Sequence, residues 1–310
     1  MITVLKGERG GLEKINELAS NIWVNVIDPS ADEITRLRRE LGIPHDFLIA
    51  SLDIDEKART DREENVRLIL LRVPYFQGQS ADVLFTTIPL GIILTDNLIV
   101  TVCKVESDVI QDFLTGQVAG WSTAKRNRFL LQILLKTATK YLRHLRQVDK
   151  EIDALEDKLQ LSMKNKELLE LLKYQKSLVY FTTALRSNEL MMERLQKSQL
   201  FEMHPDDGDL LEDVLTENQQ AIEMVGISND ILSQMMDAFA SIISNNLNVV
   251  MKFLTSVTII LMLPTLVASF YGMNVGLPLQ NSPYAFLLTL IFSLAISFVV
   301  VLVFLKKNWF

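Results

Sequence analysis

The strongest pattern in the chain is a pair of long hydrophobic runs close to its carboxyl end. No Asp, Glu, Lys, Arg or His occurs between Phe253 and Leu305. Phe253–Tyr271 supplies 19 residues and Tyr284–Leu305 supplies 22, and a bilayer core about 30 Å thick needs about 20 helical residues. The connecting residues 272–283 contain glycines and prolines that end helices. This pattern predicts two membrane-spanning helices and disfavours a single buried hairpin of a soluble protein.

Polar and soft side chains follow one face of the first predicted span. Successive members are three or four residues apart, which is the spacing of a helix seam in a left-handed bundle. The seam consists of Asn248, Met251, Thr255, Thr258, Met262, Thr265 and Ser269. One interpretation is a packing interface, because hydroxyl side chains allow helices to approach and hydrogen-bond. The other is a pore lined by several copies of the chain, in which Met251 and Met262 form narrow apolar rings that exclude water.

The remaining residues predict an α/β domain followed by long helices. Expected strands are Ile2–Leu5, Trp23–Ile27, Val66–Val73, Val83–Thr87, Leu90–Leu94 and Leu98–Cys103, and expected helices are Ala31–Leu41 and Ser107–Leu114. No Gly or Pro occurs from Ala124 until Pro205, which favours two antiparallel helices broken near Ser162–Lys166 and a turn over Met203–Gly208. The predicted divisions are 1–120, an α/β domain; 121–208, antiparallel helices; 209–252, a stalk helix; 253–271 and 284–305, the two spans; 272–283, their loop; and 306–310, a basic tail.

Charge distribution separates the two parts of the chain and indicates their orientation. All 38 acidic and 29 of the 31 basic residues precede Phe253, giving that part a net charge of −9. An acidic surface argues against nucleic acid as a partner and is compatible with cations. Lys252, Lys306 and Lys307 flank the spans, and the loop between the spans has no basic residue. The positive-inside rule then predicts a multi-pass protein of the cell (inner or plasma) membrane with both termini in the cytoplasm.

Little in the sequence favours an enzyme. Gly7-Glu8-Arg9-Gly10-Gly11 fits neither the dinucleotide nor the Walker phosphate-loop pattern. The three histidines, His45, His144 and His204, lack metal-ligand spacing. Cys103 is the single cysteine, which excludes a disulfide framework. We therefore expect no enzymatic activity, and a membrane-anchored scaffold is the other class to exclude.

The loop after the first span carries a family resemblance. Tyr271-Gly272-Met273-Asn274 at the outer end of a penultimate span resembles the signature of the CorA family of magnesium channels. Met251–Thr255 is similar to the family's entry into that span, Trp23–Val26 to its early tryptophan strand, and Leu52–Arg59 to an acidic segment of some members. The chain departs from the family at Pro264, because the family's proline directly follows the methionine, where Leu263 stands here.

The resemblance implies a homopentameric channel for divalent cations, with magnesium as the expected ion. It assigns the selectivity filter to Gly272, Met273 and Asn274, and the pore lining and gate to Leu254 together with the seam. Asn274 amide oxygens would bind the water shell of an ion that gives up water reluctantly, and Gly272 would allow a backbone conformation closed to other residues as the helix ends. Zinc-transporting relatives tend to have Gly-Ile-Asn, so a zinc transporter, or a cobalt or nickel transporter, is the alternative. The expected ions are thus Mg²⁺ and, as alternatives, Co²⁺, Ni²⁺ and Zn²⁺.

The resemblance also implies a regulatory cation site between neighbouring subunits. Counting back from the Gly-Met-Asn motif, Asp213 falls at an acidic regulatory position and Asp237 at an acidic position near the cytosolic pore end. Asp53, Asp55 and Glu56 are the candidate partners for Asp213 from the adjacent subunit. Facing carboxylates repel, so a bound cation would clamp the subunits and hold the pore shut.

Overall fold

The computed structural model describes residues 1–8, 11–15, 19–162, 165–197, 205–278, 282–307 and 309. It divides into two compact units, Met1–Gln234 and Met235–Phe310. The predicted turn at Met203 and His204 and the loop residues 279–281 lie outside the described residues.

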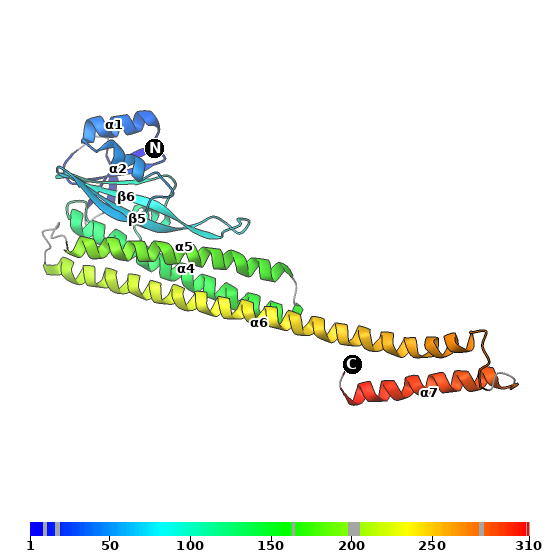
Figure 1. Cartoon of the computed structure of the whole chain (residues 1–310). Helices are drawn as coiled ribbons and strands as arrows, with labels where there is room; N and C mark the ends of the chain where they lie inside the picture. The colour runs from blue at the N-terminus through cyan, green and yellow to red at the C-terminus, as the bar shows by residue number, and fades with distance from the viewer. Residues whose placement is uncertain are drawn as a thin grey trace. The chain divides into compact units, whose positions relative to one another are not determined.

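A seven-stranded sheet forms the centre of the first unit (Figure 1). Its strands, in the spatial order β2-β1-β3-β7-β6-β5-β4, are β1 Ile2–Glu8, β2 Gly11–Lys14, β3 Ile22–Ile27, β4 Arg59–Glu63, β5 Val66–Phe76, β6 Phe85–Leu94 and β7 Leu98–Cys103. Only the β3–β7 pair among these neighbours is parallel. Val83–Thr87 and Leu90–Leu94 were expected as separate strands; the structure corrects this, because β6 continues through Pro89, which lies opposite Arg72 of β5.

Helices cover both faces of the sheet, as expected for an α/β domain. α1 Ala31–Leu41 and α2 His45–Ala50 pack on one face, against alternate residues of the central strands such as Val24, Leu70 and Val100. α3 Asp108–Leu114, α4 Arg126–Ser162 and α5 Asn165–Lys197 cover the other face, which carries Trp23, Leu71 and Ile99. The alternation follows from the period of two along a strand.

Gly91 of β6 allows Ser51, the residue that caps the end of α2, to lie very close to the strand. A Cβ atom at Gly91 would lie 1.8 Å from Ser51 Oγ, so no other residue fits without displacing this serine. Ser51 caps α2 and donates its hydroxyl to Phe47 O at 2.7 Å. The acidic segment that begins two residues later therefore starts from a fixed position beside β6.

Helix α6 runs from Pro205 to Tyr271 and belongs to both units. Pro205–Gly208 was expected within a turn, but these residues form the first turn of α6, where proline is tolerated because the first amide of a helix has no helical acceptor. In the first unit, polar contacts fix the register of α6 against its neighbours. Ser228 Oγ donates to Asp149 Oδ1 of α4 at 2.6 Å, and Asn229 Nδ2 donates to Thr182 Oγ1 of α5 at 3.1 Å.

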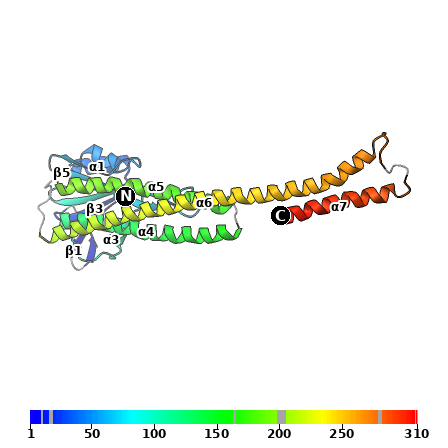
Figure 2. The same cartoon turned by 60° about the horizontal axis from the view of Figure 1, so that its bottom comes forward.

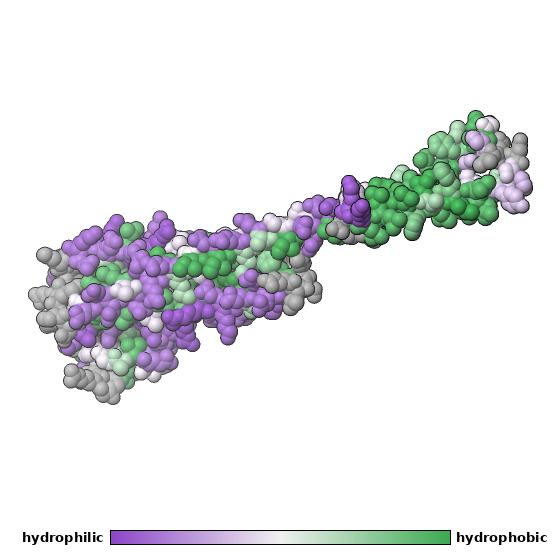
Figure 3. Space-filling model, turned by 90° about the horizontal axis from the view of Figure 1, so that it is seen from below, coloured by the Kyte–Doolittle hydropathy of each residue, from purple (hydrophilic) through white to green (hydrophobic). Residues whose placement is uncertain are grey.

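The second unit contains the end of α6 and helix α7, Ala285–Lys306. Among the described residues, α6 and α7 are the two helices long and apolar enough to cross a membrane. Hydrophobic residues cover the visible face of this pair, whereas hydrophilic residues dominate the visible face of the first unit (Figure 3). Helix α6 ends at Tyr271, the last residue of the first predicted span, and α7 begins and ends one residue later than the predicted Tyr284–Leu305.

Candidate functional site

The polar seam of the first span lies on an exposed face of α6 in the single chain. All seven seam residues are exposed, and so is Leu254. A different set of α6 residues faces the second span: Ser256 is fully buried, and Ile260, Pro264 and Val267 are partly buried. The cartoons show α7 beside this part of α6 (Figures 1 and 2). The second span therefore leaves the seam uncovered.

Two hydroxyl groups of the seam, those of Thr258 and Thr265, donate their hydrogen bond within the helix. Thr258 Oγ1 donates to Leu254 O at 2.8 Å, and Thr265 Oγ1 donates to Leu261 O at 3.1 Å. Each hydroxyl oxygen keeps its capacity to accept hydrogen bonds. Water bound to a cation points its hydrogens outward, so an exposed row of acceptor oxygens is chemically suited to a hydrated cation.

The two spans meet through small hydroxyl residues at the proline of α6. Pro264 has no N–H, so Ile260 O loses the helical donor that it would otherwise have. Ser297 of α7 donates to this carbonyl at 3.4 Å and also lies 3.1 Å from Ser293 O in its own helix. In a bilayer an unpaired carbonyl is costly, and a hydroxyl from the neighbouring helix reduces this cost. The side chains of Ser293 and Ser297 are accordingly buried.

The Gly-Met-Asn motif follows the last turn of α6. Gly272 N donates to Ala268 O at 3.0 Å and Met273 N to Phe270 O at 3.2 Å, while the Tyr271 hydroxyl donates to Pro278 O at 3.3 Å. Met273 and Asn274 are exposed. The Tyr271 hydroxyl thus connects the end of α6 to the loop. Asn274 lies just beyond the end of this helix, which carries the seam.

The expectation for the backbone of Gly272 is wrong. Its φ angle is not among the positive values, which occur at other glycines such as Gly42. A Cβ atom at Gly272 would meet only Ala268 O at 3.4 Å and Ser269 O at 3.5 Å, which are ordinary contacts. The backbone at Gly272 therefore does not use the positive φ that favours glycine, and the described residues leave room for a Cβ atom there.

The predicted regulatory acids lie on two different elements. Asp213 and Asp237 are exposed on α6, Asp213 in the first unit and Asp237 in the second. Asp53, Asp55 and Glu56 lie in the segment between α2 and β4, which we call the acidic loop (residues 53–56). Across the described ranges, no three His, Cys, Asp or Glu side chains gather into a possible metal site. The shared regulatory site therefore stays a prediction.

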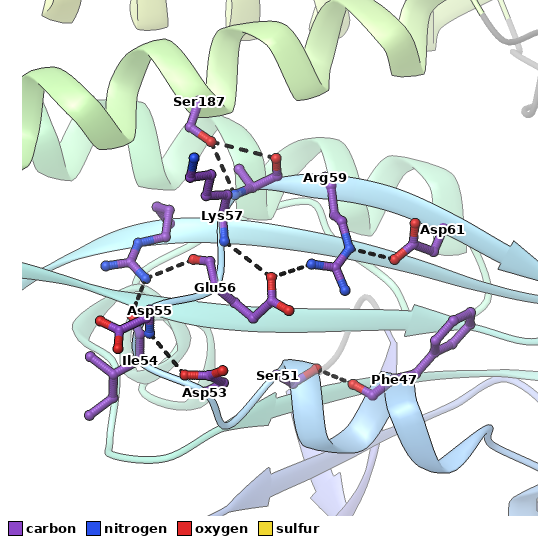
Figure 4. Close-up of polar contacts among 12 residues, drawn as sticks. Phe47, Ser51, Asp53, Ile54, Asp55, Glu56, Lys57, Arg59, Asp61 and Ser187 are labelled. Atoms are coloured by element: carbon purple, nitrogen blue, oxygen red, sulfur yellow. Dashed lines mark hydrogen bonds and ion pairs between the residues drawn. The ribbon is translucent and has the colours of Figure 1, made fainter.

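Within the acidic loop the three carboxylates differ in their partners (Figure 4). Glu56 forms an ion pair with Arg59, whose Nε donates to Asp61 Oδ2 at 2.6 Å. Asp53 Oδ1 accepts the amide of Asp55 at 3.1 Å, a local turn contact that leaves its other oxygen available. In the part of the chain that the structure describes, the Asp55 carboxylate makes no hydrogen bond or ion pair. The loop therefore offers Asp53 and Asp55 to a cation, and Glu56 much less.

Two contributors to these sites were missed by the sequence reasoning. Arg72 of β5 donates hydrogen bonds to main-chain oxygens of the acidic loop, and Ser297 binds the carbonyl that Pro264 leaves free. The sequence carries a signal for only one of them. A proline within a span requires a substitute donor nearby, whereas an arginine in an apolar strand does not reveal which loop it contacts.

The contact between Ser297 and Ile260 predicts a matched pair of stability effects. We expect Ser297→Ala to lower the unfolding free energy of the detergent-solubilised protein by about 0.5–1.5 kcal/mol, because it removes one hydrogen bond between the helices. Ser293→Ala is the control, since its hydroxyl donates to Leu290 O within α7. In a Pro264→Ala background the effect of Ser297→Ala should vanish, because Ile260 O regains its helical donor. Equal losses for both serines in thermal unfolding would contradict this account.

The chain is similar to known proteins along most of its length. The model of the family described as CorA-like Mg2+ transporter protein matches residues 19–307. The cobalt/magnesium transport protein CorA of Methanocaldococcus jannaschii is 30% identical, with all of both chains covered. That of Thermotoga maritima is 26% identical over 93% of this chain and 83% of its own length.

A solved structure described as the complete CorA magnesium transporter of Methanocaldococcus jannaschii superimposes with a TM-score of 0.87 at 27% identity, covering 100% of this chain and 99% of the other. The names of these relatives describe transport and not catalysis. The family match covers most of the α/β domain and both α6 and α7, and the expected fold class is confirmed. This chain therefore belongs to the CorA-like family of Mg²⁺ transporter proteins and is a membrane transporter, not an enzyme.

Proposed function

We propose that this protein is a magnesium channel assembled from several copies, five by the family resemblance, in which the seam of each α6 lines a central pore. The observation that carries the proposal is the exposure of the whole seam on a face of α6 that α7 leaves uncovered. A pore needs more than two helices, so the lining has to come from several chains. A scaffold protein would have no use for a polar row that ends at Asn274.

The chemistry of the pore follows from the hydration of magnesium. Mg²⁺ holds an octahedral water shell tightly, so amide oxygens of Asn274 from each subunit bind the shell without removing it. Thr255, Thr258, Thr265 and Ser269 continue a row of hydroxyl acceptors along the helix. Met251, Leu254 and Met262 form apolar rings, and such constrictions close a pore by excluding water.

The proposed orientation places both termini in the cytoplasm. Lysines flank the outer ends of the two spans and are absent from the connecting loop. Cations then enter from the side of the Gly-Met-Asn motif. The membrane potential supplies about 2.3 kcal/mol per charge at 100 mV, so uptake needs no coupled chemical reaction. Asp237, exposed on α6 before the first span, adds negative charge at the cytosolic end.

Regulation rests on carboxylates of neighbouring subunits. Asp213 of one subunit and Asp53 and Asp55 of the next share a Mg²⁺ ion when cytosolic magnesium is high, and the shared ion holds the closed state. When magnesium falls, the ion leaves, the carboxylates repel and the pore opens. Glu56 contributes little, because Arg59 already neutralises its charge.

Replacing the proposed filter amide tests transport. We expect Asn274→Ala to reduce Mg²⁺ flux into proteoliposomes by at least about ten-fold, because the substitution removes one acceptor per subunit from a single ring. The flux is followed with a magnesium-sensitive dye, and the yield of assembled oligomer is measured in parallel. Val275→Ala, at the next exposed position, is the matched control and should transport normally.

Parallel flux measurements with Co²⁺, Ni²⁺ and Zn²⁺ decide between magnesium and the alternative ions. Undiminished Mg²⁺ flux through the Asn274→Ala variant would refute the filter role. Faster Zn²⁺ flux than Mg²⁺ flux in the unmodified protein would favour the zinc transporter instead.

A substitution on α6 tests the regulatory site. Magnesium should protect the full-length protein against protease, since the shared ion holds the subunits together. We expect Asp213→Ala to raise the protecting Mg²⁺ concentration by about ten-fold or more, as loss of a metal-site partner does elsewhere. Asp209→Ala, which removes an exposed aspartate one turn earlier, is the control. If the Asp213→Ala variant is protected at the same Mg²⁺ concentration as the unmodified protein, Asp213 is excluded as a ligand.

A further inference from the structure

Arg72 of β5 donates hydrogen bonds to the main chain of the acidic loop. Its Nη1 donates to the carbonyl oxygens of Ile54 and Glu56, the latter at 2.9 Å. Its Nη2 donates to Thr87 O at 2.6 Å and to Thr87 Oγ1 at 2.8 Å. The planar guanidinium thus connects the loop to β6 through hydrogen bonds in a fixed geometry.

The main chain of Arg72 is itself held by the helical layer. Asn188 of α5, which is fully buried, accepts the Arg72 amide at 2.9 Å and donates to its carbonyl at 2.8 Å. The Tyr141 hydroxyl of α4 donates to the same carbonyl at 3.1 Å. The arginine therefore projects from a site that β5, α4 and α5 all hold in place.

A second contact secures the far end of the loop. Ser187 of α5, next to Asn188, accepts the amide of Ala58 at 3.1 Å, and its hydroxyl lies 3.5 Å from Ala58 O (Figure 4). Consecutive residues of one helix, Ser187 and Asn188, thus fix both Ala58, two residues beyond the acidic loop, and Arg72. The conformation of residues 54–58 is determined by the helical layer as well as by the sheet.

The charge of Arg72 is placed close to the loop without neutralising it. Burial lowers the pKa of its guanidinium, and the nearby Tyr141 and Asp55 side chains partly offset this. The guanidinium donates to carbonyl and hydroxyl oxygens, and in the described ranges it has no ion pair with Asp53 or Asp55. Both aspartates therefore remain available to a ligand while their main chain is held.

We propose that Arg72 is a positioning residue of the regulatory cation site: it fixes the main chain of residues 54–56 so that Asp53 and Asp55 meet Asp213 of the neighbouring subunit in a set geometry. This inference rests on the proposed function of that site. A loop already ordered before the ion arrives avoids the entropy cost of ordering on binding. Partners that orient metal-binding carboxylates commonly change affinity by about 10–100-fold.

The test measures the Mg²⁺ concentration that gives half-maximal protease protection of the full-length protein. Arg72→Lys keeps the positive charge and loses the forked donors, and we expect a rise of about ten-fold. Thr87→Val removes one acceptor of the guanidinium with little change in shape and should give a smaller rise in the same direction. Arg62→Lys is the matched control, because Arg62 donates to Glu64 O outside the acidic loop.

A double-variant cycle separates positioning from a general structural effect. If Arg72 acts through the loop carboxylates, Arg72→Lys should cause almost no further rise in an Asp53→Asn, Asp55→Asn background. The midpoint is the Mg²⁺ concentration that gives half-maximal protection. An equally large rise of the midpoint in that background, or a midpoint for Arg72→Lys equal to that of the unmodified protein, would overturn the inference. If Arg72→Lys does not fold, the same cycle with Thr87→Val decides.

The cycle also distinguishes failure of the inference from failure of the site. Unmodified midpoints for both the Asp53→Asn, Asp55→Asn variant and the Asp213→Ala variant would refute the regulatory site itself. A raised midpoint for those variants, combined with an unmodified midpoint for Arg72→Lys, would refute only the role of Arg72.

Discussion

A helix that crosses hydrocarbon has to cover its polar side chains with water or with protein, and this constraint governs the second unit. The seam of α6 places several hydroxyl oxygens along the predicted span of a bilayer. The second span does not cover them, because it packs on the face that carries Ser256 and Ile260. In the proposed assembly, other copies of the chain cover these side chains, and copies arranged around an axis enclose a polar path.

The same helix also carries the proposed control of that path. Helix α6 contains Asp213 and Asp237 before the first span of the chain, and the Gly-Met-Asn motif follows the last turn of this helix. In the first unit its register is held by Ser228 against α4 and by Asn229 against α5. The acidic loop is fixed to α5 by Ser187 and, through Arg72, by Asn188. Cation binding at the loop would therefore act on helices that contact α6 directly.

Much of the architecture was predictable because it depends on local sequence patterns. Charge-free runs predicted both spans, and the helix Ala31–Leu41 matched its observed bounds. Strand β4, Arg59–Glu63, was missed because this edge strand is almost entirely polar and has no apolar alternation. The short helix α2 was missed because six residues do not establish a period. The Gly272 expectation failed because glycine permits a left-handed backbone without requiring it.

The candidate sites were predictable only in part, since they depend on contacts between distant residues. Periodicity placed the seam on one face, but only the structure shows that α7 packs elsewhere. The acidic loop was predicted as a set of three carboxylates, and pairing with Arg59 separates Glu56 from the other two. Arg72 lies 16 residues from Glu56 in sequence, so no local pattern connects them.

Cysteine accessibility along α6 tests the central claim most directly. The native Cys103 is buried, and burial raises the pKa of its thiol to about 11, so it gives little background reaction. Cysteines at Thr258 and Thr265 should react with a water-soluble thiol reagent in the open, magnesium-depleted channel and block Mg²⁺ flux. Cysteines at Ser256 and Ser297 should stay unreactive. Reaction at Ser256 and Ser297 without reaction along the seam would contradict a pore lined by this face.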